Sequence, residues 1–251
     1  MTTAPPSSRG ARRLAAVTLS ALTALALHGC GKQPADDSGK SLAGGDGAKR
    51  VNESQNNLKQ IIRAVHTYHE KYKQLPTAAA CDRKTGKPLL SWRVLLLPFL
   101  RQEPLFKQFK LDEAWDGPTN KPLVAKLPTA FAPVRVKTKQ PGLTFYQGFA
   151  GPGAVFEPGK RLRMASISDG TSNTALVAEA AVAVEWTKPA DLAFDPSNAL
   201  PLLGGHFDGD LALLMCDGSV TKVKKDFDAA TMKAVITRNG GEVYSLDGIK
   251  K

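Results

Sequence analysis

Residues 58–75 read LKQIIRAVHTYHEKYKQL and carry the repeat of an amphipathic helix. Apolar side chains recur every three or four residues, with charged side chains between them. These apolar positions are Leu58, Ile61, Ile62, Val65, Tyr68, Tyr72 and Leu75. Asn52 with Gln55 suits the start of the helix, and Pro76 stops it after Leu75. We expect one helix of about 23 residues, roughly 35 Å long, whose apolar stripe a sheet or other helices must cover.

The segments after this helix predict shorter elements. The apolar run at residues 91–105 contains Pro98, which favours a kinked helix or two short elements, and residues 123–127 favour a short helix. Four short apolar runs predict strands: residues 143–149, 175–186, 211–216 and 219–223. Asp217-Gly218 predicts a hairpin between the last two, and residues 229–237 predict a last helix. Without regular alternation of helix and strand, this order indicates an α+β fold with an antiparallel sheet.

The composition is that of a folded domain rather than a disordered chain. Of the 251 residues, 42% are hydrophobic and 23% are charged, which is enough apolar material for a core. The net charge is +11, and it falls to +8 without residues 1–29, which contain three arginines and no acidic residue. This surplus suits an anionic surface.

The first thirty residues have the pattern of a bacterial export signal. Arg9, Arg12 and Arg13 precede an uncharged apolar run from Leu14 to Leu27, as the basic region precedes the apolar region of a secretory signal. These 14 residues would span roughly 21 Å as a helix, against about 30 Å of hydrocarbon in a bilayer. We therefore expect a cleaved signal rather than a permanent transmembrane helix.

The end of this run resembles a bacterial lipobox, in which a cysteine is acylated and becomes the mature N-terminus. It reads Leu27-His28-Gly29-Cys30, with His28 where a small uncharged residue is usual. We expect Cys30 to be the lipid attachment site, carrying palmitate-type chains that anchor the protein to a membrane. Ordinary signal cleavage nearby is the alternative.

Residues 31–47 read GKQPADDSGKSLAGGDG and contain no aromatic residue. Such a segment buries too little surface to fold, and we expect a flexible tether. The predicted organisation is therefore a lipoprotein signal peptide at 1–29, a lipidated cysteine with a tether at 30–47, and a folded domain at 48–251.

Acylation of Cys30 would leave Cys81 and Cys216 as the two remaining thiols. An oxidising compartment permits a disulfide between them, so this pair is our candidate disulfide. The alternative is that both are small buried apolar side chains. The chain has no Cys-x-x-Cys motif, so the sequence gives no support to a thioredoxin-like or zinc-ribbon role.

Two patterns bear on metal binding. His66 and His69 lie three residues apart on the long helix, but no third ligand accompanies them, and a solvated helix face is the favoured interpretation. Asp169 and the pair Asp208 and Asp210 lie in oxygen-rich turns of the kind that hold calcium. They are our calcium candidates, although Asp, Asn, Thr and Gly also form turns without any metal.

The sequence gives no catalytic motif and predicts no cofactor. Ser219-Val-Thr-Lys222 matches a Ser-x-x-Lys pattern, but it lies on a predicted strand instead of at a helix start. Lysines form a short basic strip at positions 222, 224, 225, 250 and 251. Nucleic-acid modules combine such charges with exposed aromatic residues, so we interpret this strip as a solvated face.

Several segments together resemble the prepilin-like domain of unknown function 1559, a bacterial family often labelled by a C-terminal His-x9-Asp-Gly motif. In order, they are Asn56–Ile61, Ala64–His69, Leu90–Pro98, Ala114–Asp116 with Asn120, Gly151–Gly153, Ile167–Thr174, Glu185–Pro189, His206, Cys216–Val220 and Thr237–Glu242. The resemblance implies a fold like that of type IV pilins or type II secretion pseudopilins. A long N-terminal helix would then pack on an antiparallel sheet, with additional short helices.

The chain departs from this family in two ways. Family members usually begin with a prepilin leader and a long apolar helix that anchors and polymerises, and here a lipoprotein-type signal and a tether take their place. Ten residues rather than nine also separate His206 from Asp217, which implies a bulge or a longer loop. Some pseudopilins of this fold bind calcium through a C-terminal acidic loop, which directs attention to Asp208 and Asp210.

The sequence thus predicts an exported, non-enzymatic lipoprotein of the bacterial cell envelope with a structural or protein-interaction role. Its expected partners are the membrane, through the lipid anchor, and other envelope or secretion-system proteins, but not nucleic acid. The alternative is a calcium-binding or small-ligand module that uses the Asp169 or Asp208 turns.

Overall fold

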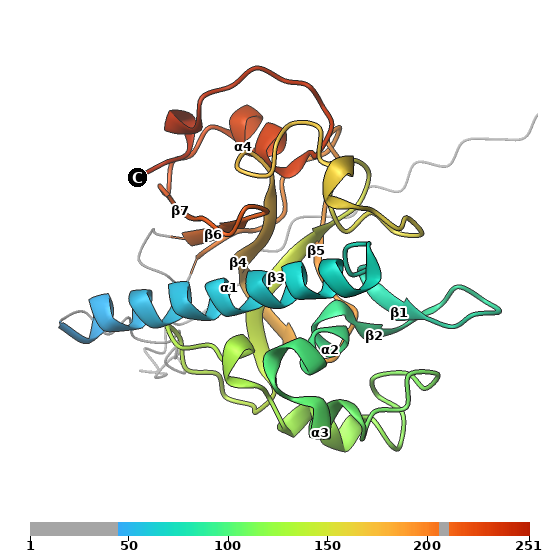
Figure 1. The fold of residues 1–251 in the computed structure, drawn as a ribbon. Helices are drawn as coiled ribbons and strands as arrows, with labels where there is room; N and C mark the ends of the chain where they lie inside the picture. Colours follow the sequence, from blue (N-terminus) through green and yellow to red (C-terminus); the bar gives the residue numbers. More distant parts are fainter. Residues whose placement is uncertain (1–44, 206–210) are drawn as a thin grey trace, which may run out of the picture. The chain divides into compact units, whose positions relative to one another are not determined.

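Helix α1 and a five-stranded sheet form the framework of the protein (Figure 1). The computed structural model describes residues 45–205 and 211–251. Its helices, with 3₁₀ turns named η, are α1 (Gly45–Tyr72), α2 (Trp92–Leu95), η1 (Leu97–Leu100), α3 (Glu103–Phe106), η2 (Lys121–Ala125), η3 (Thr129–Phe131), η4 (Met164–Ser166), α4 (Ala229–Ile236) and η5 (Leu246–Gly248). Its strands are β1 (Ala79–Cys81), β2 (Pro88–Ser91), β3 (Leu143–Ala150), β4 (Ala175–Glu185), β5 (Leu192–Ala193), β6 (Leu211–Met215) and β7 (Val220–Val223).

The main sheet has the strand order β5-β3-β4-β6-β7. The pairs β3–β4, β4–β6 and β6–β7 are antiparallel, whereas β5 pairs in parallel with β3. A separate antiparallel pair joins β1 and β2. The predicted α+β class is confirmed, and the main sheet is mixed because of β5, which the sequence patterns did not predict.

Helix α1 is longer at its start than predicted. It begins at Gly45, so residues 45–47, predicted as part of the tether, are helical, and Asn52 and Gln55 lie inside the helix rather than at its cap. The helix ends at Tyr72 because Lys73 adopts a left-handed conformation, with φ 57°, and donates its N–H to the carbonyl of His69. The first two turns are polar, and good helix formers such as Ala48, Lys49 and Arg50 sustain them.

The other predicted elements are present with small shifts. The run around Pro98 forms three short helical pieces, α2, η1 and α3, where a kinked helix or two short elements were predicted. A proline stands in the first turn of both η1 and α3, so each of these pieces begins beside its own proline. A 3₁₀ turn, η2, begins two residues before the short helix predicted at 123–127. Strands β3, β4, β6 and β7 and helix α4 each match a predicted run to within one residue at either end.

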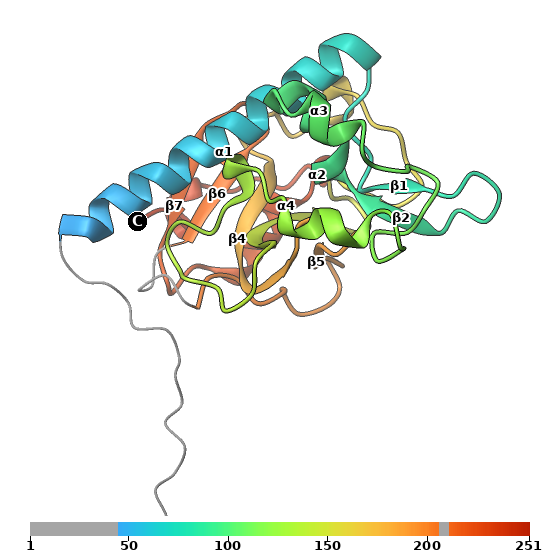
Figure 2. The same ribbon diagram turned by 90° about the horizontal axis from the view of Figure 1, so that it is seen from below.

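Strand β6 divides the interior into two apolar clusters. Ala212 and Leu214 face one cluster, which contains the α1 residues Leu58, Ile61, Ile62, Ala64 and Val65. Leu211, Leu213 and Met215 face the other, which contains Met232, Val235 and Ile236 of α4. Alternate side chains of a strand point to opposite faces, so α1 and α4 cover opposite sides of β6. Figure 2 shows α1 running along one side of the strands.

A buried carboxylate fastens α1 to the sheet. Glu179 on β4 is 1% exposed, and its Oε1 accepts a 2.6 Å hydrogen bond from the Ser54 hydroxyl on α1. Its Oε2 accepts from Arg135 Nη1 at 2.6 Å and from the Ala212 N–H at 3.0 Å. The Tyr146 hydroxyl of β3 lies 2.8 Å from Ser54 Oγ and donates to it, because Ser54 gives its one proton to Glu179. Burial raises the pKa of Glu179, while these partners lower it.

A second buried ion pair ties the first short helix to the sheet. Arg93 of α2 is fully buried and its Nη2 donates to Asp191 Oδ1 at 2.9 Å. The same oxygen accepts the indole N–H of Trp92 at 3.0 Å and the N–H of Gly148 on β3 at 2.8 Å. The pair thus connects α2, β3 and the segment before β5. Because both charges are satisfied by several partners, their burial is tolerated.

We predict that Glu179→Ala lowers the free energy of unfolding by about 3–5 kcal/mol, the range for breaking a buried charge pair. The substitution removes the acceptor for the Ser54 hydroxyl, the Arg135 guanidinium and the Ala212 N–H. Glu185→Ala on the same strand is the matched control, since its ion pair with Lys188 is partly exposed, and it should change stability by less than about 0.5 kcal/mol. Urea denaturation measures both, and equal effects would contradict this role of Glu179.

Candidate functional site

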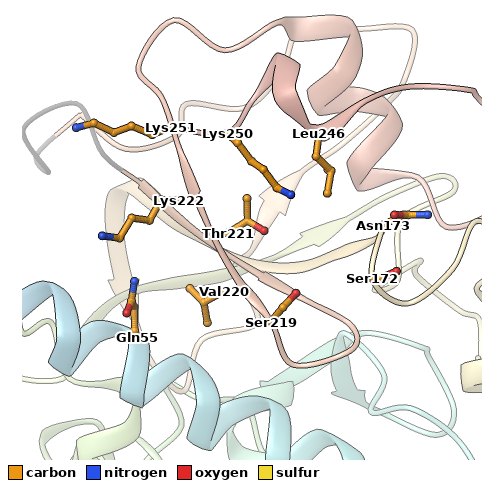
Figure 3. A pocket seen from close by; sticks show the side chains of 10 residues that line it. All are labelled: Gln55, Ser172, Asn173, Ser219, Val220, Thr221, Lys222, Leu246, Lys250 and Lys251. Atoms are coloured by element: carbon orange, nitrogen blue, oxygen red, sulfur yellow. The ribbon is translucent and has the colours of Figure 1, made fainter.

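A groove of about 680 Å³ lies beside β7, the last strand of the main sheet (Figure 3). Four parts of the chain line it: α1, the turn before β4, the β6–β7 hairpin with β7, and the C-terminal segment. The lining residues are Gln55, Ser172, Asn173, Ser219, Val220, Thr221, Lys222, Leu246, Lys250 and Lys251. In Figure 3, Gln55 of α1 lies on one side of the strand, and Leu246 and Lys250 lie on the other.

The backbone of β7 is partly open toward this groove. In an antiparallel pair, successive residues direct their N–H and C=O groups alternately toward and away from the partner strand. The Lys222 carbonyl and the Lys224 N–H point away from β6, since they bond to the Lys251 N–H at 3.2 Å and to the Ile249 carbonyl at 2.9 Å. Val220, two residues before Lys222, points the same way. Within residues 45–205 and 211–251, its N–H and C=O have no partner on that side.

The lining is cationic and rich in hydroxyl and amide groups. Its three charged residues are Lys222, Lys250 and Lys251, and all three are exposed. Among the described residues, the ammonium groups of Lys222 and Lys250 form no ion pair. Ser172 and Thr221 add hydroxyl groups. This set of donors suits an anionic ligand rather than a metal ion.

The turn of the β6–β7 hairpin positions the groove. Gly218 has φ 96°, a left-handed conformation that favours glycine, and its N–H bonds to the Met215 carbonyl at 3.0 Å. The N–H groups of Cys216 and Asp217 donate to the carbonyls of Thr174 and Thr171, at 2.9 and 3.0 Å. These bonds hold the turn that carries Ser172 and Asn173 against the hairpin. The predicted Asp217-Gly218 hairpin therefore sets one end of the groove.

Asp169, a calcium candidate, has a clear structural role. Its Oδ2 and Oδ1 accept the backbone N–H groups of Gly240 and Gly241, at 2.7 and 3.1 Å. The Asp169 N–H also donates to the Arg238 carbonyl at 3.1 Å. Both carboxylate oxygens thus hold the segment after α4 in place. Asp208 and Asp210, the other calcium candidates, and His206 lie outside the described residues.

The two histidines of α1 line a separate pocket of about 410 Å³ with Glu70, Met164, Thr171, Cys216 and Asp217. His66 Nε2 lies 2.9 Å from the Cys216 carbonyl, so this nitrogen carries the proton. His69 Nε2 accepts the Met164 N–H at 3.3 Å, so its proton is on Nδ1. Both rings therefore bind backbone and fasten α1 to the hairpin and to η4. The described residues contain no group of three metal-binding side chains.

The candidate disulfide between Cys81 and Cys216 is absent, because both thiols are free. Cys81 is exposed on β1 of the small sheet, whereas Cys216 follows β6 of the main sheet and is 2% exposed. The two thiols belong to different sheets, which the linear sequence does not show. Burial and the charge of Asp217 raise the pKa of Cys216 to about 12, so the reactive thiolate is scarce despite the neighbouring histidines.

A family model described as "Protein of unknown function (DUF1559)" matches residues 48–140 and 128–201. The match covers more than half of the chain, and the chain belongs to this family. The resemblance inferred from the sequence is thus confirmed at the level of the domain family. No curated protein and no solved structure matches the chain. Along the described residues, no helix is both long enough and apolar enough to cross a bilayer, while Cys30 and the apolar run before it lie outside those residues.

Part of this groove is visible in the sequence. The lysines at 222, 250 and 251 were predicted as a solvated strip, Gln55 was assigned to the start of the helix, and Ser172 and Asn173 lie in the family-like segment Ile167–Thr174. Leu246 was not predicted to take part in any site. The missing information was the bridge between Val223 and Lys250, which brings the C-terminal segment beside β7.

We predict that Asp169→Ala loosens the segment after α4, because two backbone N–H groups lose a charged acceptor. Trypsin should cleave after Arg238, a residue only 6% exposed, about tenfold faster, as expected for a loss of about 1.4 kcal/mol in the local opening equilibrium. Asp195→Ala is the control, since the bonds of the Asp195 carboxylate to described residues all lie within its own exposed turn. An unchanged cleavage rate after Arg238 in Asp169→Ala would show that this contact does not hold the segment.

We also predict that the folded Cys30→Ala protein has a single reactive thiol. A thiol reagent should label the exposed Cys81 quickly and Cys216 only after unfolding, because burial protects the thiol and raises its pKa. Mass spectrometry counts the labels, and Cys81→Ser in the same background should remove the fast one. If the protein accepts no label until it is reduced, Cys81 and Cys216 form a disulfide after all.

Proposed function

We propose that this protein is an exported, non-enzymatic lipoprotein of the bacterial cell envelope that binds another envelope component through the groove beside β7. The lipid on Cys30 anchors the protein, residues 31–44 act as the tether, and the folded domain makes the contact. The observation that carries the binding role is the groove itself, in which lysines and hydroxyl groups from separate parts of the chain line an open strand edge.

The arrangement of α1 and the sheet supports a pilin-like or pseudopilin-like domain. A long N-terminal helix lies over antiparallel strands, and the family match at residues 48–201 covers most of this helix together with β3 and β4. Pilin-like domains usually act through contacts with other proteins rather than through catalysis. The lipobox-like sequence at Leu27–Cys30 supports an anchor made of lipid in place of an apolar helix. The same sequence pattern supports export to the envelope.

The distribution of shifted pKa values supports binding rather than catalysis. Functional acids, bases and nucleophiles usually have shifted pKa values and line a cleft. Here burial raises the pKa of Glu179 and Asp191, whose carboxylates lie in the interior and belong to the networks that hold the fold together. Burial also raises the pKa of Cys216, which lines the histidine pocket, and a raised pKa keeps this thiol in its less reactive form. The groove is lined instead by groups that recognise a charge or donate a hydrogen bond.

We predict that the mature protein, purified from a membrane fraction, begins at Cys30 and carries acyl chains. Intact-mass spectrometry should show this mass, and Cys30→Ala should lack the acyl mass and move to the soluble fraction, because the anchor is lost. Cys81→Ala is the matched control and should keep both the acyl mass and the membrane location. A mature wild-type protein that begins at another residue and is released in soluble form would contradict the anchor.

A further inference from the structure

The open edge of β7 has the features of a site for strand addition. In this mode an extended peptide pairs with an exposed strand, and main-chain hydrogen bonds supply much of the affinity. The C-terminal segment already pairs with β7 in this way at Lys222 and Lys224. It leaves the Val220 end of the strand open, between α1 on one side and Leu246 on the other (Figure 3).

The charges beside this edge select the kind of segment that fits. The side chain of Lys222, which belongs to β7, lies on the side of the strand that faces Gln55, and Lys250 lies on the other side. The lining contains no acidic side chain. Successive side chains of an extended strand point to opposite sides. Two consecutive acidic residues can therefore each reach one lysine while their backbone pairs with Val220.

A second copy of this chain fits the same edge poorly. A twofold pairing of two β7 edges would bring the lysine-rich rims of both copies together without an opposing charge from the lining. Like charges that face each other across a strand pair are destabilising. Lysine on an edge strand is also a common device against self-association.

We infer that the open edge of β7 is a docking site for an extended, acidic segment of a partner protein, which adds beside Val220 and places consecutive carboxylates against Lys222 and Lys250. The inference rests on the proposed binding role of the groove and names the class of its partner.

The test uses the purified full chain in detergent and a blocked, fluorescent peptide, Thr-Val-Glu-Glu-Val-Thr, with Thr-Val-Gln-Gln-Val-Thr as the neutral control. Fluorescence anisotropy should give a dissociation constant below about 1 mM for the acidic peptide and about tenfold weaker binding for the neutral one. Hydrogen exchange of the Val220 amide should slow when the acidic peptide is present, because strand addition gives this N–H an acceptor.

Two variants separate charge from backbone pairing. Lys222→Glu/Lys250→Glu should weaken binding about tenfold or more, whereas Lys84→Glu/Lys121→Glu, which reverses the same number of exposed charges elsewhere, should not.

Val220→Pro removes the outward N–H, at an edge position where proline is tolerated, and should also weaken binding about tenfold. Val243→Pro in a fully exposed loop is its control. Circular dichroism melting verifies the fold of each variant. If Val220→Pro does not fold, the hydrogen exchange of Val220 in the wild-type protein decides whether the peptide pairs with the backbone.

The other outcomes overturn the inference in distinguishable ways. Peptide binding could depend on the lysines while the peptide does not slow hydrogen exchange at Val220 and Val220→Pro binds as well as the wild-type protein. That result would support an anion-binding groove and exclude strand addition. A lipid surface would be the partner if three results came together. Vesicles containing anionic phospholipid would bind the Cys30→Ala protein after signal removal, this binding would be lost when Lys222→Glu/Lys250→Glu is added, and the acidic peptide would not compete with the vesicles. Failure of the acidic peptide to bind overturns the inference whether or not Cys30 carries a lipid.

Discussion

The Glu179 carboxylate is the contact on which the arrangement of the domain depends. It lies between α1 and the sheet, where it accepts from Ser54 of α1, from Arg135 and from the Ala212 N–H of β6. Apolar packing alone lets a helix slide over a sheet at modest cost, whereas a buried carboxylate must keep its donors. Ser54 precedes Gln55, so the contact that fixes α1 also fixes one wall of the groove beside β7.

Periodic patterns made most of the framework predictable. The stripe of α1 and the short apolar runs of β3, β4, β6 and β7 mark side chains that are buried on one face or both, and such patterns can be read in the linear sequence. The short strands β1, β2 and β5 carry only two to four residues each, too few for a repeat. The burial of Arg93 and Glu179 could not be predicted either, because a charged residue normally indicates a surface position. Their burial depends on partners 98 and 125 residues away.

The candidate site was only partly predictable for a related reason. Lysine positions can be counted in a sequence, but a groove exists only once segments meet, and here residues 55, 172, 222 and 250 meet through long-range pairing. Asp169 shows the reverse case. Its oxygen-rich turn is compatible with calcium, yet both carboxylate oxygens accept from Gly240 and Gly241. The pattern of residue types is the same for both roles, and only the position of the distant backbone decides between them.

The edge of β7 shows how one strand can resist aggregation and still present a binding surface. Its far end is paired with the C-terminal segment, so only a short length of backbone is open. A short edge offers few main-chain bonds, which makes non-specific strand pairing weak. Side-chain charge must then supply the selectivity, and lysines repel another lysine-rich edge while attracting carboxylates. The backbone thus determines where a segment can add, and the lysines determine which segments are accepted.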